Sequence, residues 1–136
     1  MPEKNVSAYS FFGSNQKNIF VAFIDEGDEF FTYLQRILSS VKINVDADCL
    51  LLKTNADNII LPKLFEIQRE NNFSKAIFFG IKPEQLGLQI DLPKQQQVIS
   101  IQQTEILFTD ALSIIQKSNA AQRGLLRDNL LIMVNG

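Results

Sequence analysis

Ile19-Phe20-Val21-Ala22-Phe23-Ile24 runs directly into Asp25-Glu26-Gly27-Asp28. An unbroken apolar run of this length is typical of a strand covered on both faces of a sheet, so we expect it to be central. From Asp28 onward apolar residues recur at helical spacing, and they are Phe30, Phe31, Leu34, Ile37, Leu38 and Val41. A buried strand that leads through an acidic turn into an amphipathic helix is the repeating unit of α/β proteins.

The same unit recurs along the chain. Residues 49–52 (Cys-Leu-Leu-Leu) and 75–79 (Lys-Ala-Ile-Phe-Phe) repeat the short apolar signal of a strand. Pro62 is placed to open a helix between them, because proline is favoured at the first helical position. Residues 98–101 predict a fourth strand, which we place near an edge of the sheet because Gln-rich stretches flank it.

The C-terminal part of the chain predicts two more helices. Thr109 is a candidate N-cap for a short helix. Asn119 and Gln122 have the spacing of a capping box for a last helix, which then carries several leucines.

Strands that alternate with helices predict right-handed crossovers and a parallel sheet. We therefore expect an α/β fold, a three-layer α/β/α sandwich whose mostly parallel sheet has about four strands. Residues 1–17 have neither helical nor strand periodicity and predict a flexible N-terminal tail. A single α/β domain is then expected to span residues 18–136.

Composition narrows the function classes. The 136 residues include 13 basic and 15 acidic side chains, a net charge of -2, which argues against a broad electrostatic contact with nucleic acid and against direct sequence-specific binding to it. No signal peptide and no apolar run of membrane-spanning length are recognisable, so we expect a cytoplasmic protein.

The chain lacks the usual parts of a catalytic or metal site. It has no His, which removes the commonest general base and nitrogen ligand. A single cysteine, Cys49, falls in an apolar run and is expected to be a buried structural residue. The six glycines form no dinucleotide or phosphate-binding motif. We therefore expect no cofactor, no metal and no enzyme activity.

Asp25 and Glu26 are the candidate acidic site. They follow the first strand, and the carboxyl ends of strands are where open α/β sheets bind ligands. A magnesium or acid-base site, in vestigial form, is one interpretation. A solvated loop with charges that favour the helix N-terminus is the other.

Arg123 and Arg127 are spaced i, i+4 on the predicted last helix, where they form either a contact for a phosphate or partner or an ordinary solvated face. Tyr9, Phe11 and Phe12 are aromatic side chains in a polar tail. They either pack back onto the domain or anchor the tail in a groove of another protein.

The order of several features resembles a known family. An apolar strand begins with Asn18-Ile19, acidic residues lead into a helix with a leucine-rich face, and a Cys-Leu strand follows at Cys49. Residues 76–80 repeat a hydrophobic strand that ends in a loop, and residues 121–126 (Ala-Gln-Arg-Gly-Leu-Leu) lie where the family has a Lys-Arg-x-Leu-Trp element. Together these resemble the psi subunit family of the bacterial DNA polymerase III holoenzyme, although the chain lacks its Trp.

The resemblance implies a fold similar to that of uracil-DNA glycosylases without their catalysis. It also implies an accessory protein of the replication clamp loader, bound to clamp-loader subunits through the tail residues Tyr9, Phe11 and Phe12. Two alternatives stay open: an α/β module that binds another protein or a small ligand, and a degenerate glycosylase-like protein whose acid would be Asp25.

Overall fold

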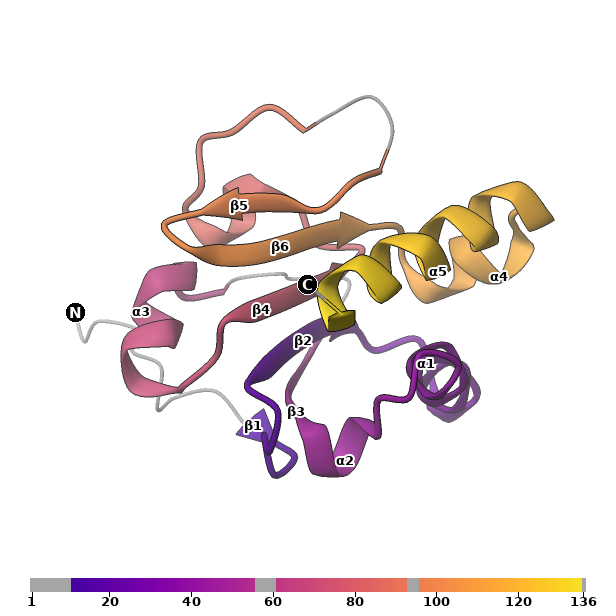
Figure 1. The fold of residues 1–136 in the computed structure, drawn as a ribbon, viewed down its shortest axis with the longest axis horizontal. Helices are drawn as coiled ribbons and strands as arrows, with labels where there is room; N and C mark the ends of the chain where they lie inside the picture. The colour runs from indigo at the N-terminus through magenta and orange to yellow at the C-terminus, as the bar shows by residue number, and fades with distance from the viewer. Residues whose placement is uncertain (1–10, 56–60, 93–95, 136) are drawn as a thin grey trace.

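A computed structural model describes residues 11–55, 61–92 and 96–135. In these ranges the chain forms a mixed α/β fold around one six-stranded sheet (Figure 1). The strands, in their order across the sheet, are β1 (Phe11–Phe12), β3 (Cys49–Thr54), β2 (Ile19–Ile24), β4 (Lys75–Phe79), β6 (Thr104–Thr109) and β5 (Ile99–Ile101).

The four middle strands β3, β2, β4 and β6 are mutually parallel, and β1 and β5 pair antiparallel at the two edges. The prediction of a mostly parallel α/β sheet is confirmed, as is the edge position of residues 99–101. The expected count of about four strands is wrong, because β1 and β6 were not predicted as strands.

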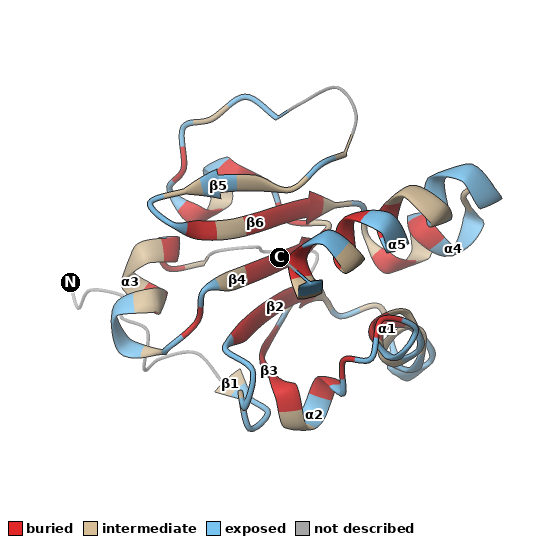
Figure 2. Ribbon diagram, in the orientation of Figure 1, coloured by how far each residue is buried: buried red, intermediate tan, exposed pale blue. Residues whose placement is uncertain are grey.

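Helices cover both faces of this sheet. They are α1 (Asp28–Ser39), α2 (Val45–Asp48), α3 (Leu64–Glu70), the 3-10 helix Pro83–Leu86, α4 (Leu112–Lys117) and α5 (Ala120–Asn135). Successive strand residues point to opposite faces. In β2, Val21 therefore packs in the cluster that holds α1, α4 and α5, and Phe20 packs in the cluster that holds α3. The middle of β2, β4 and β6 is buried, as Figure 2 shows.

Residues 11–17 belong to the domain and not to a tail. Phe11 and Phe12 pair with Leu52 and Leu51 of β3. The next residues bond to the backbone of α2 and the start of β3, for example Ser14 N to Asp46 O at 2.8 Å. The predicted boundary after residue 17 therefore does not fall there, because backbone pairing with a buried strand can hold a segment that has no periodicity of its own. Residues 1–10 lie outside the described ranges.

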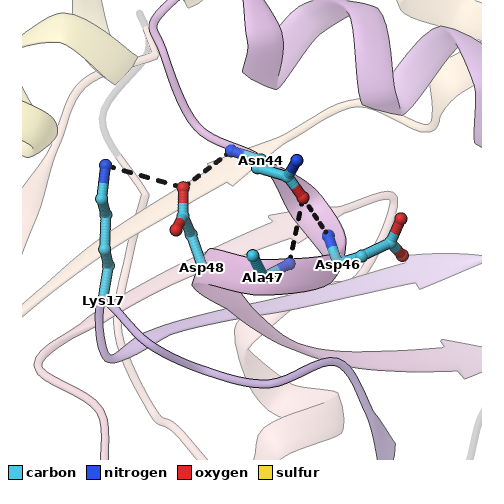
Figure 3. A network of polar contacts seen from close by, with 5 residues as sticks. All are labelled: Lys17, Asn44, Asp46, Ala47 and Asp48. Atoms are coloured by element: carbon cyan, nitrogen blue, oxygen red, sulfur yellow. Dashed lines mark hydrogen bonds and ion pairs between the residues drawn. The ribbon is translucent and has the colours of Figure 1, made fainter.

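A polar network orders the start of β3 (Figure 3). The Asn44 side chain accepts hydrogen bonds from the backbone N–H groups of Asp46 and Ala47, which caps α2. The buried carboxylate of Asp48 accepts from Asn44 N at 2.8 Å and lies 3.6 Å from Lys17 Nζ. Each buried polar atom in this network thus has a partner, as burial requires.

Two helix starts differ in how they are capped. The Asn119 carboxamide accepts from Gln122 N at 2.9 Å, so the predicted start of the last helix is confirmed. Thr109, by contrast, ends β6 and does not cap α4, which begins at Leu112 without a side-chain cap of its own. Glu26 from the β2–α1 loop accepts from Ser113 N at 3.1 Å instead.

Candidate functional site

A hollow of the described surface lies at the carboxyl ends of the parallel strands. From β2, the sheet order runs to β3 on one side and to β4 and β6 on the other. The chain thus adds β3 on one side of β2 and later strands on the other side. In open parallel sheets such a reversal of strand order leaves a crevice at the carboxyl ends, and ligands bind there. A cavity of about 900 Å³ is found at this place, bordered by residues from β2, β6, α4, α5, the loop after β4 and the segment before β5. We call it the carboxyl-end groove.

The groove combines an apolar base with a polar border. Its buried lining residues are Ile81, Phe108, Ile115 and Leu126. Two large apolar side chains in its lining are exposed, Ile114 at 55% and Leu92 at 45%. The lining also carries one cation, Lys82, and one anion, Asp110. Its size lies within the roughly 300–1,000 Å³ typical of ligand sites.

Gly80 allows the strand ends below the groove to pack closely together. Its φ is +78°, and a Cβ placed there would come 2.8 Å from Ile24 Cδ1 and 3.0 Å from Ala111 Cβ. Gly80 N also donates to Thr109 O at 2.9 Å. Only glycine combines a left-handed backbone with so little space, so this residue holds the ends of β2, β4 and β6 together.

An amide network fixes the segment before β5 against α5. The buried Asn129 donates from Nδ2 to Gln96 O at 3.1 Å, and Gln96 Nε2 donates to Thr109 Oγ1 at 2.8 Å. Gln96 and Thr109 both border the groove. Gln96 is thus joined to α5 and to the end of β6 by directional bonds, and this part of the groove border is preformed.

Asp25 and Glu26, the predicted acidic site, are engaged within the protein. Asp25 Oδ1 accepts from Gly27 N at 3.1 Å, and its other oxygen lies 3.8 Å from Lys53 Nζ. Both oxygens of Glu26 bond to Ser113, one to the backbone N–H and one to the hydroxyl. Neither residue lines the groove, although both leave the sheet beside it. The two carboxylates therefore tie the β2–α1 loop to β3 and α4 and do not converge on one point.

Arg123 and Arg127, the predicted contact pair, lie exposed on α5. The Arg123 guanidinium donates to Ser118 O, which satisfies a carbonyl at the C-terminal end of α4. Gln122 and Leu125 of the same helix border the groove, whereas the two arginines do not.

Phe11 and Phe12 pack on opposite faces of β1. The Phe11 ring lies 6.2 Å from that of Phe20, and the Phe12 ring lies 6.2 Å from that of Phe31. Phe12 is still 38% exposed. Of the two interpretations for the tail aromatics, packing on the domain holds for Phe11. Phe12 keeps a free surface, and Tyr9 lies outside the described residues.

A second hollow, of about 370 Å³, lies between the end of α1 and α2. Asp48 lines it with its carboxylate already bonded to Asn44 N. The adjacent Cys49 is fully buried, and this burial, with the charge of Asp48 as a smaller cause, raises the pKa of its thiol from 9.0 to about 12. A thiol that stays protonated at neutral pH is a poor nucleophile and metal ligand.

Metal binding and membrane insertion are two further functions that side chains and helices can support. Among the residues that the structure describes, no three Cys, Asp or Glu side chains come close enough together to hold a metal ion. No described helix has both the length and the apolar character needed to cross a membrane. The sequence matches no protein-family model, and no curated protein is similar enough to count as a relative.

Sequence reasoning missed the residues that line the groove, above all Lys82, Asp110 and Ile114. One signal was available for Ile114. Leu112 and Ile115 are spaced i, i+3 on one face of α4, so Ile114 between them had to point elsewhere. Lys82 and Asp110 each lie in a loop directly after a parallel strand, but their sequence surroundings contain no motif.

Proposed function

We propose that this protein is a non-catalytic binding subunit that acts through contacts with another protein. The observation that carries the proposal is the use of Asp25 and Glu26 inside the fold, outside the groove. A general base has to reach the proton it removes, within about 3 Å or through one water. The groove offers apolar, amide and hydroxyl groups, which are the means of recognition.

More specifically, we propose a cytoplasmic accessory protein of the replication clamp loader, of the psi type. The support is the order of sequence features described above, carried on a mixed α/β fold with four parallel strands. The alternation of strands and helices in the sequence also leads us to propose a three-layer α/β/α sandwich, with which helices on both faces of the sheet are consistent. Tyr9 and the exposed part of Phe12 are the proposed anchors for clamp-loader subunits.

Affinity capture tests this proposal. The full-length protein, immobilised and exposed to an extract of its native host, is expected to retain clamp-loader subunits identified by mass spectrometry. Tyr9→Ala combined with Phe12→Ala should abolish that retention, because aromatic anchors carry much of the energy of peptide interfaces. Phe11 is left unchanged since it packs on Phe20. Clamp-loader subunits that are absent from the captured proteins would refute the psi assignment.

The glycosylase alternative has a direct assay. Incubation of the protein with uracil-containing DNA is expected to release no uracil, and Asp25→Asn is expected to behave identically. The reason is that Asp25 is held by Gly27 and Lys53. Release of uracil that depends on Asp25 would overturn the non-catalytic proposal.

The small-ligand alternative is favoured by one observation, the volume and place of the carboxyl-end groove. A thermal-shift screen of common metabolites tests it. A stabilisation that is lost in Ile114→Arg would establish a small-molecule site and would replace the protein-binding proposal for this groove.

A further inference from the structure

The carboxyl-end groove carries two exposed apolar side chains in a concave surface. Ile114 from α4 and Leu92 from the segment before β5 both border it, although each is about half exposed. Isolated exposed apolar residues are common on proteins, but a pair at the mouth of one hollow marks a contact for a ligand or partner. The buried Phe108 and Ile115 continue the apolar surface inward.

Two opposite charges border the same groove. Lys82 follows β4 and Asp110 follows β6, and these strands are neighbours whose last paired residues are Phe79 and Thr109. Within the described ranges, neither Lys82 nor Asp110 forms an ion pair. One cation and one anion give this lining no net charge, so it is a poor site for a polyanion such as nucleic acid. It is complementary to a segment that itself carries both signs.

The amide groups of the lining match a peptide backbone. Asn119 uses its Oδ1 to cap α5, while for Gln122, also at the groove, no side-chain hydrogen bond is found in the described part of the chain. A primary amide donates and accepts side by side, as a peptide group does. An apolar base, amides and a balanced charge pair together fit a peptide better than they fit a sugar, a nucleotide or a lipid tail.

We propose that the carboxyl-end groove binds a short peptide segment of a partner protein. The apolar side chains of this peptide contact Ile114 and Leu92. An acidic side chain of the peptide pairs with Lys82, and a basic side chain pairs with Asp110. The proposal rests on the protein being a non-catalytic binding subunit, and it holds whether or not the clamp loader is a partner.

A displayed library of random short peptides, selected against the full-length protein, tests the groove. Enriched peptides are expected to share an apolar pair flanked by one acidic and one basic residue. Their affinity, measured by fluorescence polarisation on the synthesised peptides, should fall about tenfold or more in Ile114→Arg, as for a central interface residue. Ile132→Arg is the matched control, since Ile132 is 57% exposed on α5 and does not border the groove.

Charge reversal sharpens the assignment. Lys82→Glu is expected to weaken the enriched peptides and to favour versions in which the acidic residue is replaced by lysine. Unchanged binding to both versions would overturn the placement of the charges. The proposal as a whole fails if no peptide is enriched, or if Ile114→Arg leaves binding intact. It also fails if sedimentation shows a dimer that Ile114→Arg dissolves, because a second copy would then fill the groove.

The two proposals fail separately. Loss of peptide binding in Ile114→Arg does not depend on Tyr9, and capture of clamp-loader subunits through Tyr9 and Phe12 does not depend on the groove. Capture of those subunits without enrichment of any peptide would support the psi assignment and refute the groove proposal. The converse result would support the groove proposal and refute the psi assignment.

Discussion

The amino and carboxyl ends of the parallel strands differ in how their charged side chains are used. At the amino ends, Lys75 Nζ lies 2.8 Å from Glu105 and also donates to Met133 O, which ties the end of α5 to the sheet. At the carboxyl ends, Lys82 and Asp110 border the groove without an ion pair in the described ranges. The amino ends of β4 and β6 thus use their charges to stabilise the fold, whereas Lys82 and Asp110 after these two strands are left unpaired in the described ranges.

The two ends also differ in the size of the hollow beside them. At the amino end of β3, Asp48, Asn44 and Lys17 form a network around the strand start, beside the smaller hollow of about 370 Å³. At the carboxyl end, Gly80 lets the strands approach closely, and the space above them stays open as the groove. Binding residues are commonly found on loops that a rigid scaffold positions, and here the fixed amino end is that scaffold.

The largest expected effect on stability is that of Gly80→Ala, which disturbs the backbone at the carboxyl ends of the strands. It should lower the free energy of unfolding by about 3 kcal/mol, because a left-handed alanine is strained and its Cβ overlaps Ile24 and Ala111. Urea denaturation measures the loss. Gly27→Ala is the comparison, with φ +109° and ψ 165° but nothing within 4 Å of its Cβ, so backbone strain alone should cost roughly 2 kcal/mol. Equal losses would show that the close approach at Gly80 is unimportant.

Lys75→Met should have the next largest effect and tests the contrast between the ends. Removing the ammonium leaves the Glu105 carboxylate and the Met133 carbonyl without this partner, so we expect a loss of about 2 kcal/mol. Lys82→Met at the carboxyl end should change stability by less than about 0.5 kcal/mol, as for a free surface charge. Urea midpoints of the two variants, compared at one pH, decide the question. Similar losses in both would remove the distinction.

The smallest effect is a pH dependence at the amino end of β3. The Cys49 thiol has its pKa raised to about 12 by burial, so between about pH 9 and pH 12 it ionises in the unfolded chain and stays protonated in the folded one. Unfolding then releases a proton, and between pH 8 and pH 10 this residue should lower stability by about 1.4 kcal/mol, with no contribution at lower pH. The difference between wild-type and Cys49→Ala stabilities isolates the effect. If that difference is constant from pH 8 to 10, the thiol is not buried as described.

The sequence predicts β2, β3, β4 and the edge strand β5, but it predicts neither the other edge strand, β1, nor the middle strand β6. Residues 19–24 and 75–79 are apolar throughout because both faces of β2 and β4 are buried, and that pattern is readable without a structure. β1 has only two residues, too few to show any period. Its place is set by pairing with Leu51 and Leu52, which lie far along the chain.

The hairpin from β5 to β6 shows a second reason why part of the fold could not be predicted from the sequence. Its turn residues, Gln102 and Gln103, have φ values of +49° and +67°. Asn-Gly or Asp-Gly is the usual sequence for such a turn, so Gln-Gln gives no hairpin signal. Without that signal, Thr109 at the end of β6 is interpreted as a helix cap. The carboxyl edge could be expected to hold a site from the strand order alone. The identity of its lining could not, since Lys82, Asp110 and Ile114 meet only through the parallel register.

The pairing of β1 with β3 has a consequence for how many molecules this protein can hold. β1 forms one edge of the sheet, and β2, the nearest strand that borders the groove, lies two positions away, about 10 Å at the usual strand spacing. A chain that grips Phe12 at that edge therefore leaves Ile114 accessible to another. With both proposals correct, the domain would bind one partner at its β1 edge and a second at the carboxyl-end groove.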